Sequence, residues 1–163
     1  MDSKIVTIEK KYLVGKKLEM SLTNQLTSIL WKSFQPIIPT IQHRNSNELI
    51  SLSMYPAGYF QSFDPNAMFQ KWALVEVSKF FDFPPETEGF TLDGGLYAEF
   101  LYKGLPSEAG PFFHSIFMDW LPNSNFQLDN RPHFEVMGEK YKNNDPESEE
   151  LVYIPIQETQ KGA

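Results

Sequence analysis

The order of predicted elements constrains this chain more than any single motif. Apolar residues at alternating positions predict strands, and apolar residues at helical spacing predict helices. Taken in order, the sequence predicts strand, helix, strand, strand, and then the same four elements again. In the first half these are residues 4–20, 24–35, 48–55 and 71–78, and in the second half 94–102, 111–121, 133–139 and 151–156. We therefore predict an internal duplication, with repeat one at about 4–79 and repeat two at about 93–157, within a single domain spanning 1–163.

Proline and glycine set the expected boundaries of these elements. Thr23 or Asn24 is a suitable cap for the first helix, and Pro36 ends it. Pro111 suits the first turn of the second helix, and Pro122 ends that helix. The stretch 4–20 is expected to form one long strand that is broken or bulged at glycine 15.

The predicted fold class is α+β. Two β-α-β-β units would pair their strands into one antiparallel sheet with pseudo-twofold symmetry. Both helices would cover one face, and that face would form the core. The opposite face would then be covered, wet, or used as a ligand cleft.

Composition and charge exclude several function classes. The chain of 163 residues carries a net charge of −7, and its lysines are scattered, which argues against direct nucleic-acid binding. It contains no cysteine and no apolar run near the ~20 residues of a membrane span. Its three histidines lie far apart, and it lacks nucleotide-binding motifs. We expect a soluble, cytoplasmic protein without a metal, a cofactor or a membrane partner.

The strand at 133–139 carries a carboxylate among apolar residues. If Phe134, Val136 and Gly138 face the helices, then His133, Glu135, Met137 and Glu139 face the open side. The same parity brings in Trp72, Leu74, Glu76, Ser51 and Ser53, with Tyr97 and Tyr153 as further candidates. Such a face is suited to a lipophilic cation, because Glu135 supplies the charge and aromatic rings add cation–π attraction.

Two alternatives stand beside this interpretation. Glu135 would also be explained as a surface carboxylate or as the ion-pair partner of Arg131. Trp120, at the end of the second helix, is explained by the apolar stripe of that helix as well as by ligand contact.

Four short motifs resemble a known family. They are Gly95-x-Tyr97-Ala98-x-Phe100 with Gly104, Trp120-Leu121-Pro122-x-Ser124, Arg131-Pro132-x-Phe134-Glu135, and Tyr153-Ile154-Pro155-Ile156. In this order they resemble the GyrI-like small-molecule-binding domain, which is also the effector-binding module of many bacterial multidrug-responsive transcription activators. The motifs cover roughly residues 94–156, whereas the first half is similar by layout.

The resemblance implies the duplicated fold, a cleft between the halves, and a glutamate, here Glu135, that faces hydrophobic cations. Three positions depart from the family pattern: Met137 replaces a common aromatic, Asn125 a common glycine, and Leu151 a usual glutamate, with Glu150 one place early. With a strand expected from residue 4, no room is left for a helix-turn-helix. Because of these three departures, the ligand preference is expected to differ from that of other members.

Three functions follow as hypotheses. The first is a stand-alone sensor or sequestering module for lipophilic, cationic small molecules, with Glu135, Met137, Trp72, Tyr97, Trp120 and Tyr153 as its ligand-binding residues. The second, implied by family members that hydrolyse strained alkylating molecules, is a hydrolase that uses Glu135 as base with Tyr97 or Tyr153. The third is a protein-interaction role, such as restraint of a topoisomerase.

Overall fold

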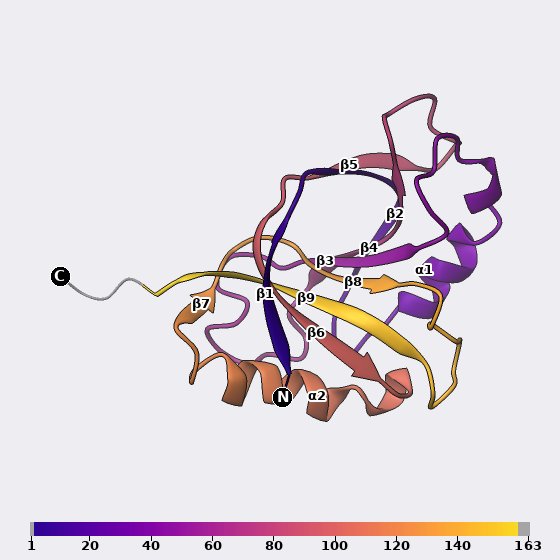
Figure 1. Ribbon diagram of the computed structural model, residues 1–163. Coiled ribbons are helices and arrows are strands. Elements are labelled where there is room, and N and C mark those ends of the chain that lie inside the picture. Colours follow the sequence, from indigo (N-terminus) through magenta and orange to yellow (C-terminus); the bar gives the residue numbers. More distant parts are fainter. Residues whose placement is uncertain (1, 160–163) are drawn as a thin grey trace.

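One curved antiparallel sheet organises the chain. The computed structural model describes residues 2–159, and in Figure 1 one helix lies to the right of the sheet and the other lies below it. The strand order is β1-β6-β9-β8-β3-β4-β2-β5, with β7 added beside β9. The strands are β1 (Ser3–Ile8), β2 (Lys11–Met20), β3 (Leu49–Met54), β4 (Phe69–Val77), β5 (Glu88–Leu92), β6 (Gly95–Lys103), β7 (Phe126–Leu128), β8 (His133–Met137) and β9 (Glu149–Glu158). The predicted α+β class and antiparallel sheet are confirmed.

The strand order is matched about its centre, where β3 pairs with β8. Outward from β3 come β4, β2 and β5, and outward from β8 come β9, β6 and β1. The strands β2, β3 and β4 therefore take positions equivalent to those of β6, β8 and β9. Two paired units would have this symmetry, although the duplication and the boundaries proposed for it stay predictions.

The expectation of one long first strand is wrong. β1 pairs with β6, whereas β2 pairs with β4 and β5 on the other side of the sheet. Gly15 does not break β2. A Cβ atom at this position would lie 1.8 Å from the carbonyl oxygen of Ala73, so glycine allows the two strands to approach closely. The break instead falls at Glu9 and Lys10, which connect β1 at one side of the sheet to β2 near the other.

The two main helices cover the sheet near its two ends. The first is α1 (Thr27–Phe34), followed by a 3₁₀ turn, η1 (Ile38–Thr40). The second is α2 (Gly110–Ser115), preceded by η2 (Pro106–Glu108) and continued as a π-helical turn, η3 (Ile116–Trp120). Within residues 2–159, no helix combines the length and the apolar character needed to cross a bilayer.

Of the two predicted helix starts, only that of α2 agrees with the structure. Pro111 occupies the first turn of α2, as predicted. The expected cap of α1 is wrong: Leu26 precedes the helix without a side-chain cap. The Thr23 hydroxyl donates a hydrogen bond to Asn66, and the Asn24 backbone N–H donates one to the hydroxyl of Ser21. Both residues therefore belong to a turn that precedes α1.

The strand register places both helices on the same face of the sheet. Ala73, Ser51, Glu135, Val152 and Phe100 are paired across five neighbouring strands and share this helix-bearing face. α1 packs with Ala73 at one side, and η3 packs through Ile116 with Phe100 and Val152 at the other. The middle of the face, around Ser51 and Glu135, lies between the two helices.

The opposite face closes into an apolar core that we call the inner cluster: Leu13, Ile50, Leu52, Trp72, Leu74, Leu92, Tyr97, Phe134 and Tyr153. Val6 and Ile8 of β1 and Phe90 of β5 pack against it from the two ends of the sheet. The sheet thus curls over this face, and little of it remains open. The sequence predicted a ligand cleft on this face without helices, but the face is packed, and the cavity lies on the face that carries the helices.

Candidate ligand-binding site

A cavity of about 820 Å³ lies on the helix-bearing face, above the middle of the sheet. This volume is within the range of small-molecule sites, which run to roughly 1,000 Å³. Its floor comes from β3, β4, β8 and β9, and its sides come from α2, η3 and the connection between β3 and β4. The principal lining residues are Ser51, Ser53, Tyr55, Tyr59, Phe60, Phe63, Phe69, Lys71, Phe113, Phe117, Leu121, His133, Glu135, Val152 and Ile154.

Five polar side chains form what we call the polar floor: Ser51, Ser53, Lys71, His133 and Glu135. The strand register explains why they meet. Ser53 is paired with both Lys71 and His133, and Ser51 is paired with Glu135. Paired residues of antiparallel strands point to the same face, so two adjacent rows of the sheet carry all five.

Aromatic rings surround the floor and form what we call the aromatic wall: Tyr55, Tyr59, Phe60, Phe113 and Phe117. The Phe60 ring stacks at 5.3 Å on Phe117 and at 5.4 Å on His133. The Tyr55 ring lies 4.6 Å from the Tyr59 ring. The segment after β3 and the second helix are thereby joined through ring contacts across the cavity.

Glu135 is the central carboxylate of the floor. It is half-buried, and among residues 2–159 its side chain has neither a hydrogen-bond partner nor an ion-pair partner. A carboxylate withdrawn from water without a partner is costly, unless a bound molecule supplies the partner. The arrangement is therefore suited to a ligand that brings a positive charge or a strong donor.

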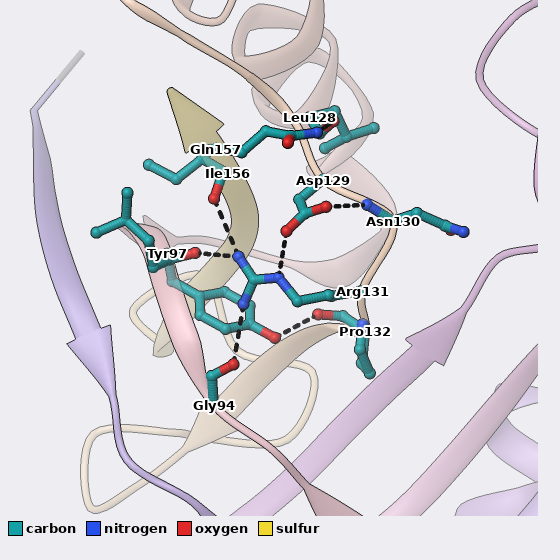
Figure 2. Close-up of polar contacts among 10 residues, drawn as sticks. Gly94, Tyr97, Leu128, Asp129, Asn130, Arg131, Pro132, Ile156 and Gln157 are labelled. Carbon is teal, nitrogen blue, oxygen red and sulfur yellow. Dashed lines mark hydrogen bonds and ion pairs between the residues drawn. The ribbon is translucent and has the colours of Figure 1, made fainter. Parts of the chain in front are cut away.

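Arg131 is not the partner of Glu135, because its donors are engaged elsewhere (Figure 2). Its Nε donates to Asp129 at 2.6 Å. Its terminal nitrogens donate to the carbonyl oxygens of Gly94 at 3.1 Å, Leu96 at 2.6 Å and Ile156 at 3.0 Å. The guanidinium thus ties the loop before β8 to β6 and β9, which is a structural role.

Tyr97 and Trp72, both predicted to contact ligand, lie in the inner cluster. The Tyr97 ring packs under the guanidinium of Arg131 at 4.8 Å, and its hydroxyl donates to the carbonyl of Pro132 at 2.8 Å. The Trp72 indole N–H donates to Gln70 at 2.7 Å. Neither side chain lines the cavity, because strand register turns both toward the face that the sheet encloses.

Tyr153 lines the cavity but also belongs to the inner cluster. Its ring stacks on Phe134 at 4.7 Å, and its hydroxyl donates to Glu99 at 2.7 Å. Both tyrosines suggested as helpers of a catalytic Glu135 therefore have hydroxyls engaged with other acceptors. The structure does not bring the predicted catalytic set together.

Met137 and Trp120 complete the predicted ligand contacts. Met137 is buried on the same strand as Glu135, but it is not among the residues that line the cavity. Trp120 packs edge-on against Phe100 at 5.0 Å, and its indole N–H donates to Ser3 at 3.0 Å. Of the six predicted ligand residues, only Glu135 and Tyr153 line the cavity.

Burial controls the charge state of the floor. Burial, assisted by the neighbouring Lys71, lowers the pKa of His133 to about 3, so its imidazole is neutral near pH 7. Burial also raises the pKa of Tyr55. Burial and the nearby charge of Glu135 raise the pKa of Glu150, on β9, to about 7. Across the part of the chain that the structure describes, no group of three or more histidines and carboxylates is placed to hold a metal ion.

The aromatic wall is the part of the site that was not predicted from the sequence. Tyr55 ends the strand predicted at 48–55, and Tyr59, Phe60 and Phe63 follow within eight residues in a segment expected only to connect two strands. Connections usually run over the surface, where large apolar side chains are disfavoured. This concentration of rings beside Pro56 and Gly58 was the available signal.

Comparisons with known proteins agree on the fold. The sequence profile described as the GyrI-like small-molecule-binding domain matches residues 1–157. A comparison with curated protein sequences found no match to the chain. Among solved structures, SAV2435 bound to tetraphenylphosphonium is similar with 14% identity, a TM-score of 0.72, and coverage of 96% of this chain and 94% of that one. The EcmrR C-terminal domain is similar with 12% identity, a TM-score of 0.70, and coverage of 97% and 98%. A hydrolase from Listeria innocua is similar with 11% identity, a TM-score of 0.63, and coverage of 96% and 92%.

Proposed function

Because the chain belongs to the GyrI-like small-molecule-binding family, we propose that it binds lipophilic, aromatic cations in the cavity, with Glu135 as their counter-charge. The proposal includes a role as a binding module, which either senses such molecules or sequesters them. Its ligand-binding residues are Glu135 and the aromatic wall. Of the other residues expected from the sequence, Tyr153 lines the cavity, whereas Trp72, Tyr97, Trp120 and Met137 do not.

The observation that carries this proposal is the half-buried carboxylate of Glu135, which has no ion-pair partner within residues 2–159. A cation in the cavity would satisfy this charge. The surrounding rings would each add a cation–π contribution of roughly 0.5–2 kcal/mol and would cover the apolar body of the ligand. One of the solved neighbours has tetraphenylphosphonium bound, which makes this cation a suitable probe.

The test is a calorimetric titration with tetraphenylphosphonium and with neutral triphenylphosphine oxide, on the wild type and on Glu135→Gln. We expect the substitution to weaken cation binding by about tenfold or more, since it removes a Coulombic attraction of roughly 1–4 kcal/mol between the carboxylate and the cation. The neutral compound should change by less than about twofold.

Glu139→Gln is the matched control, because Glu139 is exposed and does not line the cavity. It removes the same charge and should leave both affinities nearly unchanged. Equal losses for cation and neutral compound in Glu135→Gln would refute the electrostatic role of Glu135. Mass spectrometry of each mixture should return both compounds intact, as expected of a binding module rather than a hydrolase.

A further inference from the structure

The cavity floor holds a second charge that the proposed function does not use. Lys71 lines the cavity from β4, and its ammonium group donates to the hydroxyl of Ser53 at 3.0 Å. Ser53 is paired with His133, and Glu135 follows on the same strand one row further along the sheet. A lysine and a glutamate therefore face the same space from strands on either side of β3.

Neither charge has an ion-pair partner in the described part of the protein, although the carboxyl group of Glu150 on β9 lies near both. Lys71 and Glu135 form no ion pair with each other, and within residues 2–159 neither forms one with another group. Both are half-buried, so solvent screens them less than it screens surface charges. A molecule that bridges them would satisfy both, and no rearrangement of the sheet would be needed.

The remaining ionisable groups of the lining do not alter this balance. Asp64 and His114 line the cavity but are exposed, and Asp64 accepts a hydrogen bond from the backbone N–H of Asn66 at 2.9 Å. His133 is buried beside Lys71 and is neutral near pH 7. The floor itself therefore carries one positive and one negative charge, with the carboxyl group of Glu150 close by on β9.

This pairing is unfavourable for a ligand that is only a cation. A cation attracted by Glu135 enters the field of Lys71, which opposes it. A ligand with an additional anionic group placed over Lys71 and Ser53 converts that opposition into attraction. Charge-assisted hydrogen bonds from an ammonium group and a hydroxyl to a carboxylate are among the stronger polar contacts in proteins.

We infer that the ligand of this protein is amphoteric: an aromatic body with a cationic group held at Glu135 and a carboxylate or similar anionic group held by Lys71 and Ser53. The inference rests on the proposed function, because it assumes that Glu135 holds the cationic end. It goes further by assigning an anion subsite and by setting the chemical class of the ligand.

Rhodamine B and its ethyl ester provide the test, since the two dyes share one aromatic cation and differ only in a free carboxylate. Fluorescence-anisotropy titrations at about pH 8 keep that carboxylate ionised. We expect wild-type protein to bind rhodamine B roughly tenfold more tightly than the ester. Lys71→Met should abolish this preference and should bind the ester at least as tightly as the wild type does.

The controls separate a local effect from a general one. Lys79→Met removes an exposed lysine and should leave the preference unchanged. Lys71→Gln serves as a second uncharged variant if Lys71→Met unfolds, and Lys71→Arg should retain part of the preference because it keeps the charge. Glu135→Gln should weaken both dyes by a similar factor.

Two results would overturn the inference. One is a wild-type preference for the ester, and the other is a preference for rhodamine B that survives both uncharged variants. If the ester binds and depends on Glu135 while Lys71 has no effect, the proposed function stands and the anion subsite is rejected. If neither dye nor tetraphenylphosphonium binds the wild type, the proposed function and this inference are both rejected.

Discussion

The two faces of the central strands differ sharply, although they alternate along the same residues. On β8, Phe134 lies in the inner cluster and Glu135 lies on the polar floor. On β3, Leu52 and Ser51 divide in the same way. The inner cluster is sealed and almost wholly apolar, whereas the cavity combines uncompensated charge with aromatic rings. Neighbouring residues of one strand therefore divide between a packed core and the lining of an open cavity.

The difference originates in how each face is covered. β1 and β5, at the two ends of the sheet, supply Ile8, Phe90 and Leu92 to the inner cluster, so the sheet closes over that face. On the other face, α1 and η3 pack near the two sides and leave the middle to be bridged by the aromatic wall. Figure 1 shows the two helices on separate sides of the molecule. A helical layer in two separate pieces leaves room for a ligand between them.

The largest expected effect is on stability. Phe134→Ala should destabilise the protein by ~3–5 kcal/mol, because it leaves a cavity under Tyr97 and Tyr153. Ser51→Ala, on the facing strand but on the polar floor, should change stability by no more than ~0.5 kcal/mol. Urea denaturation of both variants measures the difference. Similar losses for the two would mean that the faces are not energetically distinct.

An acid-dependent effect of intermediate size is expected at His133. Its pKa is about 3 in the folded protein and 6.5 in an unfolded chain, so below pH 6.5 the unfolded chain binds the proton and the folded one does not. The stability that the neutral imidazole contributes is therefore complete above pH 6.5 and is lost as the pH falls toward 3.

His133→Phe removes this titration and keeps an aromatic ring beside Phe60. Relative to the wild type, the variant should gain roughly 3 kcal/mol between pH 7 and pH 4. Unfolding measured at several pH values gives this difference, and since Glu150 titrates in both proteins, its opposite contribution largely cancels. A constant difference across that range would show that His133 is not buried as a neutral group.

The smallest effect is expected at Trp120, which the sequence suggested as a ligand contact. Trp120→Phe loses the hydrogen bond to Ser3 and some packing on Phe100. We expect a loss of about 1 kcal/mol in stability and a change of less than about twofold in affinity for tetraphenylphosphonium. A large loss of affinity in a stable variant would return Trp120 to the site.

Local patterns in the sequence predicted much of the fold. Strand alternation located β3, β4, β6, β8 and β9 within a few residues, and Pro111 located the start of α2. Alternation missed β5 and β7, which are short and are ordered by pairing with β2 and β9. The same pattern predicted β1 and β2 as one strand, because no local feature of the sequence shows that two consecutive segments pair with different strands.

The site was predicted less well for a related reason. Parity along β8 correctly kept His133 and Glu135 on one face, but it could not decide whether Phe134 or Glu135 faced the helices. That choice depends on register with strands far away in sequence, as the pairing of Ser51 with both Ala73 and Glu135 shows. Trp72 was assigned to the cavity through the same ambiguity.

A crystal structure of the complex with tetraphenylphosphonium would test most directly whether ligands occupy the helix-bearing face. We expect the phosphorus within about 6 Å of the Glu135 carboxylate, the range over which opposite charges stabilise each other appreciably, with phenyl rings against Phe60 and Phe117. The inner cluster around Trp72 should remain closed and unchanged. A cation bound on the Trp72 side of the sheet, or only on the outer surface, would contradict the division between a sealed face and a binding face.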